Sequence, residues 1–261
     1  MDLLKTAIKA AIEAGVEINS VYESGFIKTT FKKDKSPVTN ADLVSNRIII
    51  NHLKATGIPI LSEESKTIPY NERKAWKKLW IIDPLDGTKE FLKKNGEFTV
   101  NIALITSNKP IIGVIYAPVT NELYFGYPGM GSFKAIVEDP GQDIGAIIDG
   151  AEKLPFANTN QVHTVAVSRS HMNKATEELI RSRSGSSEKP VLVSRGSSLK
   201  ICMVAEGTAR YYPRFGPTME WDIAAGHAIA EYAGKTIRGI NDGKQISYNK
   251  ENLLNPDFIV E

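Results

Sequence analysis

The sequence predicts a mixed fold, α+β in its first part and α/β in its second. Apolar residues recur at helical spacing near the N-terminus, and β-branched runs separated by turns occupy residues 99–136. Strand-like and helix-like segments then alternate beyond residue 163. A stretch rich in Asp and Gly, residues 138–150, separates the two patterns and is predicted to be a flexible loop. We therefore expect two lobes, residues 1–150 and 151–261.

The first lobe is predicted to begin with two helices. Residues 2–20 should form a helix whose buried face carries Leu4, Ile8, Ala11, Ile12 and Val16. The following polar segment KTTFKKDKSPVTN should be mobile and solvated, and its proline excludes a helix. A second helix should run from Asn40 or Ala41 to Thr56, with Asn40 as N-cap and Gly57 as the C-terminal stop.

The remaining elements are predicted strands and strand–helix pairs. IPILSEES reads as a short strand that ends in acids, and TVNIALITS, PIIGVIYAPVT, ELYFGY and GSFKAI should form an antiparallel sheet. In the second lobe, HTVAVS precedes the helix SHMNKATEELIRSR, and PVLVS precedes GSSLKICMVAEG. The strand ARYYP then leads to a helix from about Glu220 to Ala233.

Composition excludes several functional classes. The chain has 261 residues, of which 42% are hydrophobic and 24% charged, which is typical of a globular protein with a sizeable core. A formal net charge of +2 argues against a broad nucleic-acid-binding face. The single cysteine excludes an intrachain disulfide and fits a reducing cytoplasm. No run approaches the roughly 18 apolar residues of a spanning helix, so we expect a cytoplasmic protein, free or peripheral on the cytoplasmic face of the inner membrane.

Acidic residues at the ends of predicted strands are the strongest chemical signal. In WIIDPLDGTKEF, residues 80–91, an apolar strand runs directly into Asp83 and Asp86. Glu63 and Glu64 follow another strand, and Asp222 opens an apolar helix. Gathering ionised carboxylates in one cleft is costly, and a divalent cation removes that cost. Because Mg²⁺ prefers oxygen ligands, these acids predict a magnesium site.

The same turn offers groups that bind an anion. Pro84 fixes the backbone so that both aspartates and the Leu85 carbonyl can face one site. Gly87 and Thr88 follow at an expected helix start, where free N–H groups bind phosphate. Cation ligands beside phosphate donors favour a metal-dependent phosphoester hydrolase. Taken singly, each acid also has a structural explanation, as a turn former, a solvated residue or an acid in the first turn of a helix.

These motifs resemble the inositol monophosphatase superfamily of Mg²⁺-dependent, lithium-sensitive phosphatases over nearly the whole chain. WIIDPLDGTKEF matches its signature W-x-I/V-D-P-I/L-D-G-T-x-x-F/Y, and EWDIAAGHAIAEYAGK matches its second signature. SEES and TNAD match its paired glutamates and its N-terminal T-x-x-D. The resemblance implies a layered α-β-α-β-α sandwich with the active site between the two lobes.

The resemblance also implies roles for individual residues. Glu64, Asp83 and the Leu85 carbonyl would hold one Mg²⁺, and Asp83, Asp86 and Asp222 a second. Gly87 and Thr88 would bind the phosphate through their N–H groups, and the Thr88 hydroxyl paired with Asp42 would help activate the attacking water. Glu63 would orient that water, bind a third Mg²⁺ or lie in the second coordination shell of the metal ions.

Within the superfamily the chain most resembles the CysQ-type 3′(2′),5′-bisphosphate nucleotidases, through LSEES, DPLDGTKEF and YPRFGPTMEWD. These remove the 3′-phosphate of adenosine 3′,5′-bisphosphate to give AMP, in the metabolism of phosphoadenosine phosphosulfate. Ser197 and Lys200, expected one helical turn apart, and Arg214 are the candidates for binding the second phosphate. Hydrolysis of phosphoadenosine phosphosulfate itself and a monomeric or homodimeric state stay open. So do inositol monophosphatase or fructose 1,6-bisphosphatase activity and a non-catalytic nucleotide-binding role.

Overall fold

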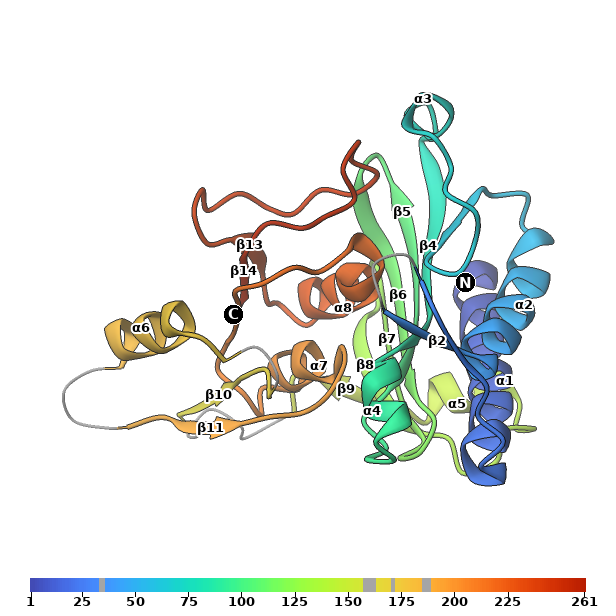
Figure 1. Ribbon diagram of the computed structural model, residues 1–261, viewed down its shortest axis with the longest axis horizontal. Coiled ribbons are helices and arrows are strands. Elements are labelled where there is room, and N and C mark those ends of the chain that lie inside the picture. The colour runs from blue at the N-terminus through green and yellow to red at the C-terminus, as the bar shows by residue number, and fades with distance from the viewer. Residues whose placement is uncertain (33–35, 157–162, 170–171, 185–188) are drawn as a thin grey trace.

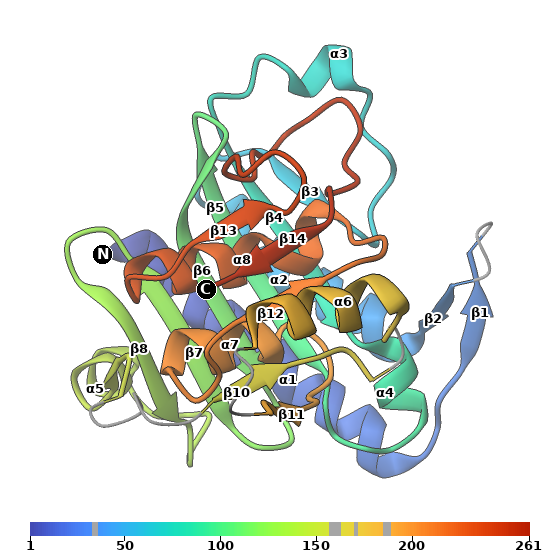
Figure 2. The same ribbon diagram turned by 90° about the vertical axis from the view of Figure 1, so that its left-hand side faces the viewer.

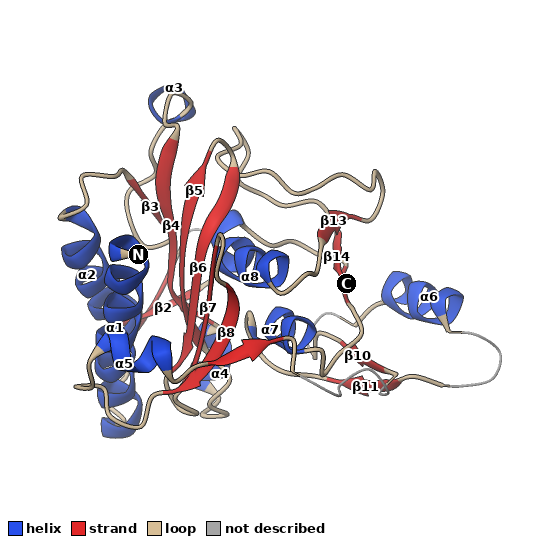
Figure 3. Cartoon of the chain, turned by 180° about the vertical axis from the view of Figure 1, so that it is seen from behind, coloured by secondary structure: helices blue, strands red, loops and turns tan. Residues whose placement is uncertain are grey.

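Helices and sheets alternate in five layers in the computed structural model (Figure 1), which describes residues 1–32, 36–156, 163–169, 172–184 and 189–261. Helices α1 and α2 cover one face of a large sheet, and α7 and α8 cover the other. A smaller sheet follows, and α6 lies on its outer side. The same layers are seen from behind in Figure 3.

The α-β-α-β-α sandwich expected from the resemblance is confirmed. Within the described part of the chain, no helix has the length and apolar character needed to span a bilayer.

The first predicted helix is present and one turn longer, as α1 (Asp2–Ser24). Leu4, Ile8 and Ile12 are buried as expected, but Val16 is 41% exposed, so its assignment to the core was wrong. Successive steps of four residues rotate by 400°, so three steps from Leu4 carry Val16 about 120° away from the buried stripe. Ile18, which falls back on that stripe, is buried instead.

The polar segment after α1 folds into a hairpin and not into a mobile loop. Strands β1 (Thr29–Phe31) and β2 (Pro37–Thr39) pair antiparallel, and residues 33–35 of the predicted loop lie outside the described residues. Figure 2 shows this hairpin extending from the body of the molecule. Helix α2 (Asn40–Lys54) follows, and its N-cap is Thr39, not Asn40, because the Thr39 hydroxyl accepts from Ala41 N at 3.2 Å. The helix ends at Lys54 with Ala55 as C-cap, two residues before the predicted end at Thr56, and Gly57 with φ +67° completes the turn that follows.

The large sheet confirms the antiparallel prediction for the first lobe. Its order is β3-β4-β5-β6-β7-β8-β9, and only β3 and β4 pair parallel within it. Its strands are β3 (Ile60–Ser62), β4 (Lys78–Asp86), β5 (Thr99–Thr106), β6 (Lys109–Ala117), β7 (Glu122–Tyr127), β8 (Gly131–Ile136) and β9 (Glu152–Leu154). Two short helices, α3 (Tyr70–Arg73) and α4 (Thr88–Leu92), flank β4.

The segment predicted as a flexible boundary loop contains a helix. Residues Ile144–Asp149 form α5, whose N-cap Asp143 accepts from Ala146 N at 3.0 Å. Strand β9 then returns to the edge of the large sheet. The division into lobes at residue 150 stays a prediction.

The second part of the chain alternates strands and helices as expected. It contains β10 (Thr164–Ala166), α6 (Lys174–Arg183), β11 (Val191–Val193), α7 (Leu199–Glu206), β12 (Tyr212–Arg214), α8 (Glu220–Tyr232), β13 (Ile237–Gly239) and β14 (Phe258–Val260). Strands β10 and β11 pair parallel, whereas β12-β14-β13 form an antiparallel sheet. The short strands β13 and β14 were not predicted.

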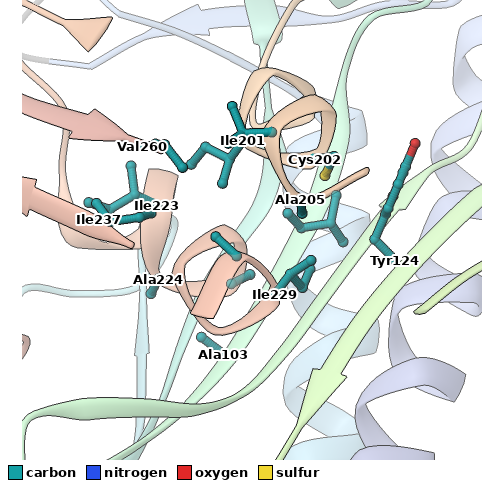
Figure 4. Close-up of a cluster of buried hydrophobic side chains, with 14 of the residues drawn as sticks. Ala103, Tyr124, Ile201, Cys202, Ala205, Ile223, Ala224, Ile229, Ile237 and Val260 are labelled. Carbon is teal, nitrogen blue, oxygen red and sulfur yellow. The ribbon is translucent and has the colours of Figure 1, made fainter. Parts of the chain in front are cut away.

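Two hydrophobic cores lie on the two faces of the large sheet. Figure 4 shows the one around α7 and α8, where Tyr124 of β7 lies beside Cys202 and Ala205 of α7, and Ile201 lies on the side of α7 toward Val260. Helix α8 approaches the sheet closely because β6 and β7 have glycines there. A Cβ on Gly113 would lie 2.1 Å from the Ala225 carbonyl oxygen, and one on Gly126 would lie 3.1 Å from the Ile229 Cα. This contact sets the position of α8, whose first turn carries Asp222.

Gly113→Ala is expected to destabilise the protein by about 1–3 kcal/mol, because the new methyl group meets a backbone oxygen that cannot move without α8. Thermal unfolding measures the loss. Gly141→Ala is the matched control, since its nearest neighbour is the Asp139 side chain at 3.2 Å, which can move away. Equal melting temperatures for Gly113→Ala and wild type would contradict the close contact.

Candidate active site

The DPLDG turn is a bulge at the end of β4. The register between β4 and β5 shifts between Asp83 and Asp86, so the two intervening residues leave the regular ladder. Asp83 Oδ1 accepts from Leu85 N at 3.0 Å, and the Pro84 carbonyl accepts from Ser45 Oγ of α2 at 2.6 Å. The bulge is therefore fixed from both sides and holds the aspartates in place.

Three carboxylates from distant parts of the chain converge beside this bulge. Glu63 follows β3, Asp83 lies in β4, and Asp222 lies in the first turn of α8, where its Oδ2 accepts from Met219 N at 2.8 Å. One oxygen of each lies within 4.8 Å of the others. Within the part of the chain that the structure describes, Glu63 and not Glu64 completes this close trio. Oxygen donors at such spacing suit a hard divalent cation such as Mg²⁺.

The electrostatics of the cluster also favour a cation. Burial, and then the charges of Glu63, Asp86 and Asp222, raise the pKa of Asp83 well above its ordinary value. Burial and the charge of Asp86 do the same to the pKa of Asp222. Burial likewise raises the pKa values of Asp42, Glu63 and Glu64. Protons therefore compete with a cation for these oxygens.

Mg²⁺ is expected to raise the melting temperature more at pH 8 than at pH 5. Acids whose pKa is raised in the folded state stabilise it below their unfolded pKa, and this stability is lost as the pH rises through the folded pKa. At high pH the cluster is ionised and repels itself, so binding of Mg²⁺ relieves the largest cost there. Thermal unfolding with Mg²⁺ and with chelator at both pH values measures the difference. An identical Mg²⁺ shift at pH 5 and pH 8 would count against a cation at this cluster.

A lysine that was not predicted reaches the same carboxylates. Lys32, beside the β1–β2 hairpin, has its Nζ 2.7 Å from Glu63 Oε1 and 2.6 Å from Glu64 Oε1. Burial alone would lower the pKa of Lys32, but the two glutamates raise it above its ordinary value. An ammonium group bridging two carboxylates shows that a positive charge fits there. The Thr-Thr-Phe run opposite Pro-Val-Thr was the available signal for the hairpin.

Asp42 and Thr88 lie together, as the resemblance implied. Thr88 Oγ1 donates to Asp42 Oδ1 at 3.2 Å, and Asp42 Oδ2 accepts from Thr39 N and Thr39 Oγ1 at 2.7 and 2.6 Å. Asp42 is buried at the start of α2, and Gly87 with φ +92° leads into α4 at Thr88. The Asp42–Thr88 pairing is therefore confirmed, whereas its role in activating water stays a prediction.

A cavity of about 360 Å³ adjoins the acidic cluster. Its wall includes Asp86, Gly87 and Asp222, and also Ser197, Lys200 and Arg214. The cavity wall thus carries two of the acids, Asp86 and Asp222, together with the cations that the sequence analysis singled out.

Two of the cations that line the cavity, Lys200 and Arg214, are buried. Lys200 Nζ donates to the carbonyls of Arg195 and Ser197 at 2.8 and 2.6 Å, and burial lowers the pKa of Lys200 to about 8. Arg214 donates to Ser168 Oγ at 3.1 Å, and its buried Nε has no partner in the described structure. Buried cations with spare hydrogen-bonding capacity are suited to binding an anion.

The predicted helical spacing of Ser197 and Lys200 was wrong. Helix α7 begins at Leu199, and Ser197 lies before it with φ +55°. The Ser197 hydroxyl donates a short hydrogen bond to Asp86 Oδ2 and also lies 2.6 Å from Thr99 Oγ1. Ser197 therefore contacts the metal-ligand candidate Asp86, and it borders the cavity from there.

Comparison with known proteins supports the resemblance to the inositol monophosphatase family. The model of the inositol monophosphatase family matches residues 1–259. The chain is 42% identical to the 3′(2′),5′-bisphosphate nucleotidase CysQ of Shigella flexneri over 99% of both chains. The crystal structure of CysQ from Bacteroides thetaiotaomicron is 48% identical and covers 100% of this chain and 97% of its own, with a TM-score of 0.89.

A more distant structure shares the fold. An IMPase/NADP phosphatase complexed with Mg²⁺ and phosphate is 21% identical, covers 94% of this chain and 85% of its own, and has a TM-score of 0.71. The family match over nearly the full length and the relatives above 40% identity agree with the layered fold and with the acidic cluster. The chain therefore belongs to the inositol monophosphatase family.

Proposed function

We propose that the chain is a Mg²⁺-dependent 3′(2′),5′-bisphosphate nucleotidase that removes the 3′-phosphate of adenosine 3′,5′-bisphosphate to give AMP. One observation carries this assignment: a single cavity is lined both by Asp86 and Asp222 of the proposed metal site and by the buried cations Lys200 and Arg214. A substrate with two phosphates can occupy both regions at once. The names of the CysQ relatives support the same substrate class.

The acidic cluster is the proposed Mg²⁺ site. Glu64, Asp83 and the Leu85 carbonyl would hold one ion, and Asp83, Asp86 and Asp222 a second, while Glu63 lies close enough to Asp83 and Asp222 to take part. When bound, Mg²⁺ supplies charge neutralisation of the phosphoryl oxygens and a more acidic water. Two ions, or a third at Glu63, are compatible with this number of carboxylates.

The proton of the attacking water is proposed to pass to Asp42 through Thr88. The Thr88 hydroxyl already donates to Asp42 Oδ1, so its oxygen can accept a hydrogen bond from water and relay the proton. Burial raises the pKa of Asp42, which makes it a better base. The N–H groups of Gly87 and Thr88 would bind the phosphate that is released.

The second phosphate is proposed to bind between Lys200 and Arg214. Charge-assisted hydrogen bonds to phosphate are the strong class, and both side chains are held by neighbours before substrate arrives. The same region would accept the phosphosulfate group of phosphoadenosine phosphosulfate, which is a second proposed substrate in sulfur metabolism.

Inositol monophosphatase or fructose 1,6-bisphosphatase activity is the alternative that keeps the metal site. The test compares kcat/KM for adenosine 3′,5′-bisphosphate, inositol 1-phosphate and fructose 1,6-bisphosphate. The proposal predicts the highest value for the nucleotide. A higher value for either sugar phosphate would overturn the substrate assignment, and nucleotide binding without phosphate release would favour the non-catalytic alternative. Cytoplasmic location and the choice between monomer and homodimer stay predictions.

A further inference from the structure

A partly buried ion network extends from the cavity wall, of which Arg195 is a part. Glu122, at the start of β7, has its carboxylate 2.6 Å from Lys134 Nζ of β8 and 2.9 Å from Arg195 Nη2. Lys134 also contacts Glu206, the last residue of α7, at 2.8 Å. Tyr124 OH donates to the same Glu206 at 2.7 Å. The large sheet and α7 are thus joined through charged groups with little exposure to solvent.

Arg195 connects this network to the cavity. Its guanidinium contacts Glu122, while its backbone carbonyl accepts from Lys200 Nζ at 2.8 Å. The Ser197 carbonyl provides the second acceptor for Lys200, at 2.6 Å. Because Lys200 is only 6% exposed, these two carbonyls decide where its ammonium group lies.

The segment of residues 195–197, which supplies both carbonyls, is also held at its middle residue, Gly196. Gly196 N donates to Glu97 Oε2 at 3.1 Å, and a Cβ on Gly196 would lie 2.4 Å from the Glu97 carbonyl oxygen. Ser197 has φ +55°, a conformation that is unfavourable for a residue other than glycine and persists only where the surroundings impose it. Glu122 and Glu97 therefore impose a specific backbone path on residues 195–197.

We propose that Glu122 is a positioning residue for the part of the cavity that is proposed to bind the second phosphate. By holding Arg195, it places the Arg195 and Ser197 carbonyls, which direct the Lys200 ammonium group. This inference rests on the proposed bisphosphate nucleotidase function. Glu122 is absent from the cavity wall, so it acts through Arg195 and does not touch substrate.

The Glu122–Arg195 contact persists over the working pH range. Although burial opposes the charge of Glu122, hydrogen bonds from Arg195, Lys134 and Thr120 lower its pKa to about 2. Glutamine at this position keeps the size of the side chain and removes its charge. Arg195 would then lose its ionic partner, and its backbone carbonyl would no longer be fixed.

Glu122→Gln is expected to raise KM for adenosine 3′,5′-bisphosphate about tenfold and to weaken binding of AMP by a similar factor, with kcat changed by less than about twofold. KM for phenyl phosphate, which has no second phosphate, is expected to stay unchanged. Glu152→Gln, at an exposed position of β9, is the matched control. A role in stability alone would lower the melting temperature without changing the ratio of the two KM values.

Arg195→Gln and the double variant, which combines it with Glu122→Gln, test whether Glu122 acts through Arg195. If Glu122 acts through Arg195, the double variant should show the KM of the single variants and not their product. Glu122→Asp keeps the charge and should restore part of the affinity. Unchanged KM for the nucleotide, equal changes for both substrates, or multiplicative effects would each overturn the inference. If wild type binds AMP but leaves adenosine 3′,5′-bisphosphate intact, the proposed function fails, and AMP binding by the variants still decides the role of Glu122.

Discussion

Asp83→Asn is expected to lower kcat for phosphate release by about a thousandfold, because the variant loses the carboxylate proposed to contact both Mg²⁺ ions. Several kcal/mol of transition-state stabilisation depend on such ions, and each 1.36 kcal/mol is a factor of ten. The fold should persist, since an asparagine oxygen can still accept from Leu85 N. Steady-state rates at saturating Mg²⁺, together with calorimetric Mg²⁺ titration, measure the effect.

The matched control for Asp83→Asn is Asp139→Asn, which makes the same chemical change at an exposed position. Thermal unfolding should show both variants folded. Mg²⁺-dependent turnover within tenfold of wild type in Asp83→Asn would disprove the assignment of Asp83 as a metal ligand.

Lys200→Met is expected to lower kcat/KM for adenosine 3′,5′-bisphosphate by about 10–100-fold, with a smaller loss for phenyl phosphate. A hydrogen bond to a charged group contributes about 1.5–3 kcal/mol, and only the nucleotide carries a second phosphate to receive it. Methionine keeps the buried aliphatic chain. Arg214→Met should behave alike, and Lys153→Met, exposed on β9, should resemble wild type. Equal losses on both substrates would show that Lys200 supports the fold and not the second phosphate.

The pH dependence of the reaction gives a second readout of Lys200. Burial lowers the pKa of Lys200 to about 8, so in the free enzyme its charge is lost as the pH rises through that value. Because kcat/KM reports the ionisation of free enzyme, its value for the nucleotide should fall above about pH 8. The Lys200→Met variant should lack this fall.

The acids of the site could be predicted because each belongs to a local motif. An apolar strand that runs into Asp83 and Asp86 predicts strand-end carboxylates, and Asp222 opens an apolar helix. Their convergence required the fold, since it depends on Gly113 allowing α8 to approach β6. The layered order of elements was expected from the resemblance to the inositol monophosphatase superfamily, because the pattern of apolar and polar residues alone does not give the order of strands in a sheet.

Contacts between distant residues could not be predicted. The polar run that contains Lys32 reads as solvated, and the contact of Lys32 with Glu63 and Glu64, which follow β3, appears only in the folded chain. The position of Ser197 outside α7 depends on Glu97 and Asp86, which are far away in sequence. Glu122 and Arg195 are 73 residues apart, and neither lies in a recognisable motif.

The most direct test of the proposed nucleotidase activity is to identify the product formed from adenosine 3′,5′-bisphosphate, with Mg²⁺ and with excess chelator. We expect one phosphate released per nucleotide, AMP with its 5′-phosphate intact as the product, and no reaction with chelator. Adenosine 3′-monophosphate as the product, equal release with chelator, or no release in Mg²⁺ would contradict it.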